Sequence, residues 1–366
     1  MEQVCKRQKR DFDEATLEDL PDEIVLKIFS SVNIRDLFRC MAVNKKISEI
    51  ANDQTLWNII HLNGNNFVND LPAELLPQIL KKGCQYLSLY NCGIKTGKVR
   101  FAKNFQLKYL ILHPEPDESD DIALNVMPDL VASCHNLEKV CIKRSDLFYP
   151  KITHMDMKFF KCIIQNSDSL KVLDLSETQL SLASVQRIFF LCQYLIELNI
   201  AGDNSLGTEL CPKSVDFLCN NLTTTIEKLD ITMQPNFGDD QFQKLIKRCN
   251  RITELSFVGT NVTDDSMNTI IETLSQSLVK LRPGMISFHK KLELALMPNF
   301  KVLINSRLSD EEREKVREIL PSMKHEDFDG DLRITEPYPD FDSDDEESEM
   351  VPNCVPTIKF FMKLSD

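Results

Sequence analysis

The chain has 366 residues, of which 42% are hydrophobic and 27% charged, and its formal net charge is −13. This is the composition of an ordinary soluble protein with one long or two medium domains. The negative balance argues against a general nucleic-acid binder. No run approaches the roughly 18 apolar residues that a membrane helix needs. The polar first 20 residues predict that there is no signal peptide.

The cysteines indicate a reducing compartment. The chain has 12 of them, none forms a Cys-x-x-Cys pair, and several recur at one position of a repeat. They are therefore expected to be reduced, buried small hydrophobic residues of a nuclear or cytoplasmic protein. A basic cluster at Lys6, Arg7, Lys9 and Arg10 is explained equally well by a nuclear import signal and by a solvated terminus. Residues 1–14 are expected to be disordered.

Residues 15–60 carry a short apolar pattern with helical spacing. Leu20-Pro21 suits the start of a helix, because proline is tolerated in a first turn and fixes φ in advance. Ile24, Ile28 and Leu37 follow at helical spacing. The stretch is about 40 residues long, the size below which isolated domains usually need help to stay folded. We therefore predict a set of docking helices that cannot make a core of its own and needs a groove on another protein.

This stretch resembles an F-box, the motif by which substrate receptors attach to the Skp-type adaptor of cullin–RING ubiquitin ligases. The matching residues are Leu20-Pro21-x-Glu23-Ile24, Ile28-Phe29, Leu37, Val43 and Leu56-Trp57. The chain departs from the family in the middle of the third helix. The family often carries a second aromatic or basic cluster where this chain has Lys45-Lys46-Ile47. The resemblance implies adaptor contacts through Leu20, Pro21, Ile24, Ile28, Phe29, Leu37 and Trp57. An ordinary helical cap on a repeat protein is the alternative.

Residues 84–335 repeat a strand pattern of the form L-x-x-L-x-L. Its central residues are Leu87, Leu110, Val140, Leu173, Leu198, Leu229 and Leu255, with weaker members near Leu281 and Leu303. Successive strong members are 23 to 33 residues apart, at or beyond the long end of the leucine-rich repeat range. Cys134, Cys192 and Cys249 each stand six residues before a central residue. The pattern predicts an α/β fold: a three-helix F-box, then a curved solenoid of cysteine-containing leucine-rich repeats with parallel strands on the concave side and helices on the convex side. Residues 61–83 are expected to be a linker and capping helix.

Side chains alternate along a strand, so the residues that flank each central residue should face the concave surface. The candidate target-binding residues are Tyr86, Tyr90, Tyr109, Lys139, Lys143, Asp174, Glu197, Asn199, Asp230 and Glu254. Along the predicted concave surface, the first quarter of the array carries aromatic residues, the next strand carries lysines, and the far half carries mostly acidic residues. We expect a partner with an apolar or aromatic element near the first repeats and basic residues near the last. An unselective solvated face is the alternative.

Residues 336–366 form a tail of two parts. Residues 340–349 hold seven acids in ten positions and are expected to be disordered. The apolar end, with Ile358, Phe360 and Phe361, is expected either to dock on the concave surface or to remain free.

No catalytic motif, phosphate-binding loop or paired zinc-ligand spacing is present, which predicts a non-catalytic protein without cofactor or metal. The resemblance implies a substrate receptor of a Skp–cullin–F-box ubiquitin ligase, linked through the adaptor to cullin and RING subunits. Its protein target stays unknown, and neither nucleic acid nor membrane is expected as a partner. The competing interpretation is a leucine-rich repeat scaffold outside ubiquitin ligases, similar to a GTPase regulator with an acidic tail.

Overall fold

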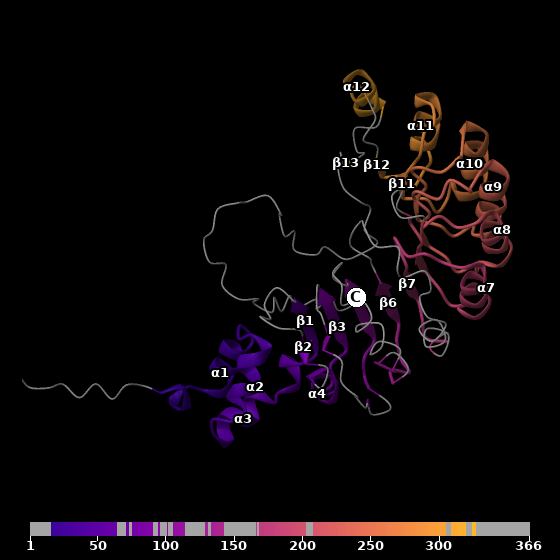
Figure 1. Cartoon of the computed structure of the whole chain (residues 1–366). Coiled ribbons are helices and arrows are strands. Elements are labelled where there is room, and N and C mark those ends of the chain that lie inside the picture. Colours follow the sequence, from indigo (N-terminus) through magenta and orange to yellow (C-terminus); the bar gives the residue numbers. More distant parts are fainter. Residues whose placement is uncertain are drawn as a thin grey trace, which may run out of the picture. The chain divides into compact units, whose positions relative to one another are not determined.

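The structure is a computed structural model that describes residues 16–63, 71–72, 75–90, 94–95, 101, 105–113, 129–130, 133–142, 166, 168–202, 208–304, 309–319 and 324–326 (Figure 1). The described part of the chain divides into two units, one that ends at Ile59 and one that begins at Ile60. No helix among the described residues is long and apolar enough to cross a membrane. The predictions for both termini, for Lys143 and for the tail lie outside the described residues.

The first unit is helical. Its elements are the 3-10 helix η1 (Leu17–Asp19), α1 (Asp22–Phe29), α2 (Ile34–Cys40), α3 (Lys45–Ala51) and the 3-10 helix η2 (Gln54–Leu56). Asn33 caps α2 by accepting from the Asp36 amide at 2.9 Å, and Asn44 caps α3 by accepting from the Ile47 amide at 2.8 Å. These caps satisfy backbone donors that a helix start leaves without partners. Helix α3 packs against both α1 and α2, as expected for a three-helix arrangement.

A small core holds this unit together. Trp57 and Val25 are fully buried, and the ring of Trp57 lies 4.9 Å from the ring of Phe38. The indole N–H donates to the Ala51 carbonyl at 2.8 Å, so the one polar atom of Trp57 has a partner. The prediction that this stretch cannot make a core of its own is therefore wrong. Aliphatic side chains from all three helices, among them Val25, Leu37, Ile47 and Ile50, are buried together with Phe29 and Trp57.

Among the described residues, the second unit is built on an eleven-stranded sheet whose strands follow the order β1-β3-β5-β6-β7-β8-β9-β10-β11-β12-β13. The strands are β1 (Ile59–Asn63), β3 (Tyr86–Tyr90), β5 (Tyr109–His113), β6 (Lys139–Ile142), β7 (Val172–Asp174), β8 (Glu197–Asn199), β9 (Lys228–Asp230), β10 (Glu254–Ser256), β11 (Lys280–Arg282), β12 (Val302–Ile304) and β13 (Lys324–Glu326). Neighbours from β3 to β13 pair in parallel. A separate parallel pair joins β2 (Leu71–Pro72) to β4 (Ile94–Lys95).

Helices line one side of this sheet. They are α4 (Leu75–Lys81), α7 (Leu182–Leu191), α8 (Pro212–Asn221), α9 (Asp239–Arg248), α10 (Met267–Leu274) with the preceding 3-10 helix η4 (Asp264–Ser266), α11 (Phe288–Ala295) and α12 (Asp310–Ile319). Figure 1 shows α7 to α11 stacked in chain order beside their strands. The predicted central strand residues are paired in register, for example Leu173 with Leu198 and Leu198 with Leu229, and they are buried. This is the leucine-rich repeat solenoid that the sequence predicts.

The sheet begins earlier than predicted. Residues 61–83 were expected to be a linker and capping helix, and α4 provides that helix, but β1 adds a strand before it. Ile60 and Leu62 are buried while Ile59 is exposed, the alternation of a strand with one face on the core. The period-two signal is present in the sequence, but it directly follows the Leu56-Trp57 motif and is only a few residues long.

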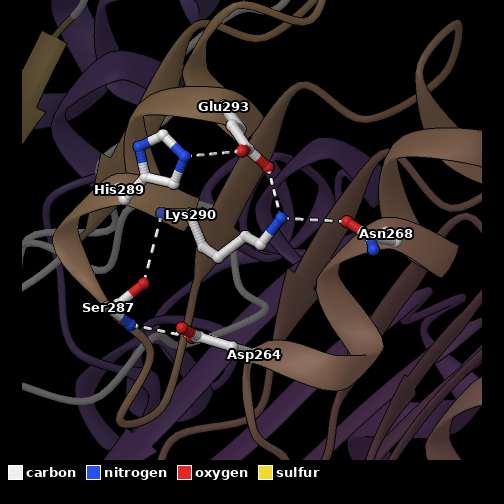
Figure 2. A network of polar contacts seen from close by, with 6 residues as sticks. All are labelled: Asp264, Asn268, Ser287, His289, Lys290 and Glu293. Atoms are coloured by element: carbon white, nitrogen blue, oxygen red, sulfur yellow. Dashed lines mark hydrogen bonds and ion pairs between the residues drawn. The ribbon is translucent and has the colours of Figure 1, made fainter.

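Adjacent repeats are joined by an acid at the start of one helix that supports the cap of the next (Figure 2). Asp264 accepts from the amide of Ser287 at 2.8 Å, and Ser287 is the N-cap of α11. The Lys290 ammonium donates to Asn268 at 2.9 Å and to Glu293 at 2.6 Å. Polar contacts therefore link η4 and α10 to α11 along the outside of the array.

Asp239 has the same role one repeat earlier. Its carboxylate accepts from the amide of Thr263 at 3.0 Å, from the Thr263 hydroxyl at 2.7 Å and from the Ser266 hydroxyl. Burial by itself would raise the pKa of Asp239, but the hydrogen bonds from Ser266 and Thr263 outweigh it and lower the pKa from 3.8. Since the charged form is favoured in the folded state, this stabilisation is present above pH 3.8 and is lost as the pH falls through the lowered value.

We predict that Asp239→Ala lowers the free energy of unfolding at pH 7 by about 1–2 kcal/mol, because charge-assisted hydrogen bonds between repeats are lost. The matched control is Asp240→Ala, an exposed acid in the same helical turn. Urea unfolding of both variants measures the difference, which should shrink as the pH falls below 3.8. Equal losses in the two variants would contradict the assigned contact.

Among the described cysteines, exposure and a lowered pKa single out one thiol as reactive. Cys211 is exposed at the N-cap of α8, and its hydrogen bond with the Ser214 hydroxyl lowers the pKa of the thiol from 9.0. Burial raises the pKa of Cys134, Cys192 and Cys249 to about 12. Iodoacetamide at neutral pH should therefore alkylate Cys211 first among the eight described cysteines. Peptide mass spectrometry measures the order, and labelling in urea provides the control in which all thiols react.

Candidate adaptor-docking and target-binding surfaces

Helix α1 presents an apolar strip to solvent. Ile24 is 46% exposed and Ile28 is 41% exposed, and residues four apart lie on the same helical face. Leu17 in η1 is also exposed, Leu20 is half-buried and Pro21 is exposed. Two large aliphatic side chains held side by side in water are costly, since each stabilises by roughly 1.5–3 kcal/mol when it is fully buried. We call the exposed or half-exposed residues Leu17, Leu20, Pro21, Ile24 and Ile28 the α1 surface.

Three residues that the resemblance assigned to adaptor contact lie inside the chain instead. Phe29 is 2% exposed, Leu37 is 3% exposed and Trp57 is fully buried. Their part of the F-box pattern therefore shapes the small core beneath the α1 surface. The correction has a simple cause: the motif mixes core and surface positions, and a family pattern alone does not separate them.

The first strands of the repeat array present aromatic side chains in a row. Tyr86 and Tyr109 are register partners on β3 and β5, and their rings lie 6.0 Å apart. The ring of His61 on β1 lies 5.1 Å from that of Tyr86, which extends the row by one strand that the sequence did not predict. Tyr90 at the other end of β3 is 42% exposed. Lys139, half-buried, is the next register partner after Tyr109. The predicted sequence of aromatic residues and then a basic step is therefore present on one surface.

The predicted acidic far half is largely neutralised. The Lys228 ammonium lies 3.1 Å from the Glu197 carboxylate and 3.3 Å from that of Glu254. Burial would lower the pKa of Lys228, but the two glutamates outweigh it and raise the pKa from 10.5. On the next strand, Lys280 pairs in register with Glu254, and Arg282 with Ser256. The solvated charge at this end is thus mixed or basic, whereas the sequence predicted an acidic one.

Three further candidates support the turns that follow the strands. Their side-chain oxygens accept from the backbone amide two residues later: Asp174 from Ser176 at 2.9 Å, Asn199 from Ala201 at 3.0 Å and Asp230 from Thr232 at 2.8 Å. All three side chains are buried, and burial raises the pKa of Asp230 to about 6. Side chains used in this way mimic a backbone turn. Asp174, Asn199 and Asp230 are therefore parts of the scaffold, and the prediction that they face a target is corrected.

Sequence reasoning missed a shallow depression along the side of the array where the chain enters the strands. Six of its lining residues are Lys108, Glu138, Lys171, Tyr194, Ile196 and Arg251. Glu138 forms ion pairs with Lys108 at 3.6 Å and with Lys171 at 3.0 Å, and Tyr194 is 59% exposed. These residues come from positions just before the strands, which the strand pattern does not mark. Among the described residues, no group of three or more His, Cys, Asp or Glu side chains could hold a metal ion.

An F-box-like domain matches residues 17–63. F-box/LRR-repeat protein 12 of Mus musculus is 22% identical over 173 residues, which cover 47% of this chain and 44% of that protein. This chain therefore aligns with less than half the length of that relative.

Two solved structures resemble the computed structure. One is a chain of the Rad7 and Elc1 complex from yeast, with a TM-score of 0.48, 14% identity, and coverage of 83% of this chain and 80% of that one. The other is the leucine-rich repeat-containing protein LegL7 from Legionella pneumophila, with a TM-score of 0.40, 11% identity, and coverage of 72% and 81%.

The division between core and surface predicts two different mutant phenotypes. Trp57→Ala removes a fully buried ring and its hydrogen bond, and should destabilise the first unit by about 3–5 kcal/mol. Ile24→Ala removes a side chain that is 46% exposed and should leave the unit folded. Hydrogen exchange of the α1–α3 amides, followed by mass spectrometry, measures both. Protection in Trp57→Ala as high as in the unmodified chain would contradict the core assignment.

Proposed function

From an F-box-like domain followed by leucine-rich repeats, the combination that gives F-box/leucine-rich repeat proteins their name, we propose that this chain is the substrate-recognition subunit of a Skp–cullin–F-box ubiquitin ligase. The F-box-like unit binds a Skp-type adaptor, and the adaptor connects it to cullin and RING subunits. The repeats bind a protein target. Ubiquitin transfer is carried out by other subunits, so this chain acts without catalytic residues of its own, in the nucleus, the cytoplasm or both.

The observation that carries this proposal is the α1 surface within the matched domain. Ile24 and Ile28 are exposed, although the same helix buries Val25 and Phe29. The unit is already folded around Trp57, so exposure of the strip is not a consequence of a missing core. An apolar strip on a folded unit is suited to a preformed groove on a partner.

The repeats support target binding by their chemistry. One end of the strand face offers the ring row of His61, Tyr86 and Tyr109, which suits an apolar or aromatic element of the target. The other end offers Lys280 and Arg282, which suits acidic groups. We propose this order of contacts in place of the basic target segment that the sequence pattern predicted. A repeat scaffold outside ubiquitin ligases remains the competing function, and adaptor binding distinguishes the two.

We predict that Ile24→Asp combined with Ile28→Asp weakens adaptor binding by a factor on the order of 100 or more. In the complex, the two aliphatic side chains that binding buries are replaced by charges that must lose their water. Titration calorimetry with a purified Skp-type adaptor measures the dissociation constant. Leu20→Ala with Pro21→Ala should also reduce binding while leaving the repeats folded.

The matched control is Leu296→Asp. Leu296 is 65% exposed at the end of α11, so it tests whether any new charge on an exposed apolar residue has the same effect. Its binding should equal that of the unmodified chain. Absence of measurable adaptor binding by the unmodified chain would refute the ligase role and favour the scaffold.

A further inference from the structure

The segment that precedes α1 contributes Leu17, Leu20 and Pro21 to the α1 surface, yet it has little packing to hold it. None of the residues of η1 is buried. A local capping box joins Thr16 to Asp19, with the Asp19 carboxylate accepting from the Thr16 amide at 2.8 Å. Such a contact shapes the turn but does not attach it to the helices. The attachment must therefore come from contacts with residues farther along the chain.

Lys46 on α3 makes these contacts. Its ammonium donates to the carbonyl oxygen of Glu18 at 2.7 Å and to that of Leu20 at 3.1 Å, and lies 3.3 Å from the Asp22 carboxylate. We call this group of one ammonium and three oxygens the Lys46 clamp. Asn44, the N-cap of α3, adds a hydrogen bond to the Glu18 carboxylate at 2.5 Å. The start of α3 thus holds the chain on both sides of Leu20.

The chemistry of the clamp fits lysine specifically. An ammonium has three N–H donors, and three oxygens surround this one. The Asp22 side chain is 69% exposed, so its ion pair with Lys46 contributes little by itself. The two backbone carbonyls are the important acceptors, because they are fixed points of the segment and are bonded by a charged donor. A planar guanidinium directs its donors in a rigid fork and does not reproduce this arrangement.

We infer that Lys46 is a positioning residue for adaptor binding: it holds residues 17–21 so that Leu17, Leu20 and Pro21 are presented together with Ile24 and Ile28. The inference rests on the proposed function. Without the clamp, the segment samples other conformations, and the measured affinity falls in proportion to the fraction that remains competent. Lys46 itself needs no contact with the adaptor. It lies at Lys45-Lys46-Ile47, where the sequence departs from the family pattern.

The test compares Lys46→Met with Lys45→Met. Both variants remove one positive charge from the first turn of α3 and keep an unbranched side chain, but Lys45 is 92% exposed and makes only a 3.9 Å ion pair with Glu49. Lys46→Met should weaken adaptor binding about tenfold, the result for a segment that is competent about one tenth of the time. Lys45→Met should stay within about twofold of the unmodified chain. Lys46→Arg should rescue binding only in part.

A double-mutant cycle separates positioning from general stability. If the clamp acts by presenting Leu20, then Leu20→Ala should cost markedly less in the Lys46→Met background than in the unmodified chain. Amide exchange in α1 to α3 should be the same with and without the clamp. Independent losses in the cycle, faster exchange throughout the three helices, or unchanged affinity in Lys46→Met would each overturn the inference. If the unmodified chain fails to bind the adaptor, the proposed function fails first, and that result is distinct from a normal affinity in Lys46→Met.

Discussion

The division of α1 between two environments is the constraint on which the rest of this molecule depends. Val25 and Phe29 point into a core that Trp57 completes, while Ile24 and Ile28 remain in solvent. A helix with apolar residues on more than one face is usually buried on every side. Here one apolar face is buried within the chain and the other is exposed to solvent. Under the proposed function, the adaptor meets a unit whose helices already pack on a core of their own, which lowers the cost of ordering on binding.

The repeats have a different arrangement, in which most positions of a strand are buried in the scaffold itself. The central residue is buried in β3 and in β5 to β12, and the third residue of a strand is often a turn-forming side chain such as Asp174, Asn199 or Asp230. The first residue of these strands is half-buried. It is Tyr86 in β3, Tyr109 in β5 and Lys139 in β6, and in β8, β9 and β10 it is the ion-paired group of Glu197, Lys228 and Glu254. Because register aligns these residues strand after strand, they form a single row across the array.

The sequence predicted the fold well because the fold is periodic. The L-x-x-L-x-L pattern recurs along the chain, and the buried Cys134, Cys192 and Cys249 stand at one fixed offset before its central residue, so each repeat supports the interpretation of the next. Strand β1 was missed because it is a single short alternation without a repeat to confirm it. The site was predicted less well. Whether Trp57 faces a partner or the core, and whether Glu254 is solvated or paired with Lys228, depends on contacts between residues far apart in the chain. Alternation gives the face of a strand but not the neighbours that a side chain meets there.

The same limit explains why Lys46 could not be assigned a role from the sequence. In the pattern it is a lysine beside another lysine, and only Lys46 reaches the carbonyls of Glu18 and Leu20, 28 and 26 residues earlier. Backbone carbonyls are present at every residue and leave no mark in a sequence, so a side chain that binds them is invisible to motif analysis. Since η1 buries no side chain, the placement of Leu17 and Leu20 is set by polar contacts. The exposed apolar α1 surface is thus held in place by charge-assisted hydrogen bonds behind it. Under the proposed function, its affinity for the adaptor therefore depends on Lys46, a residue that the adaptor does not need to touch.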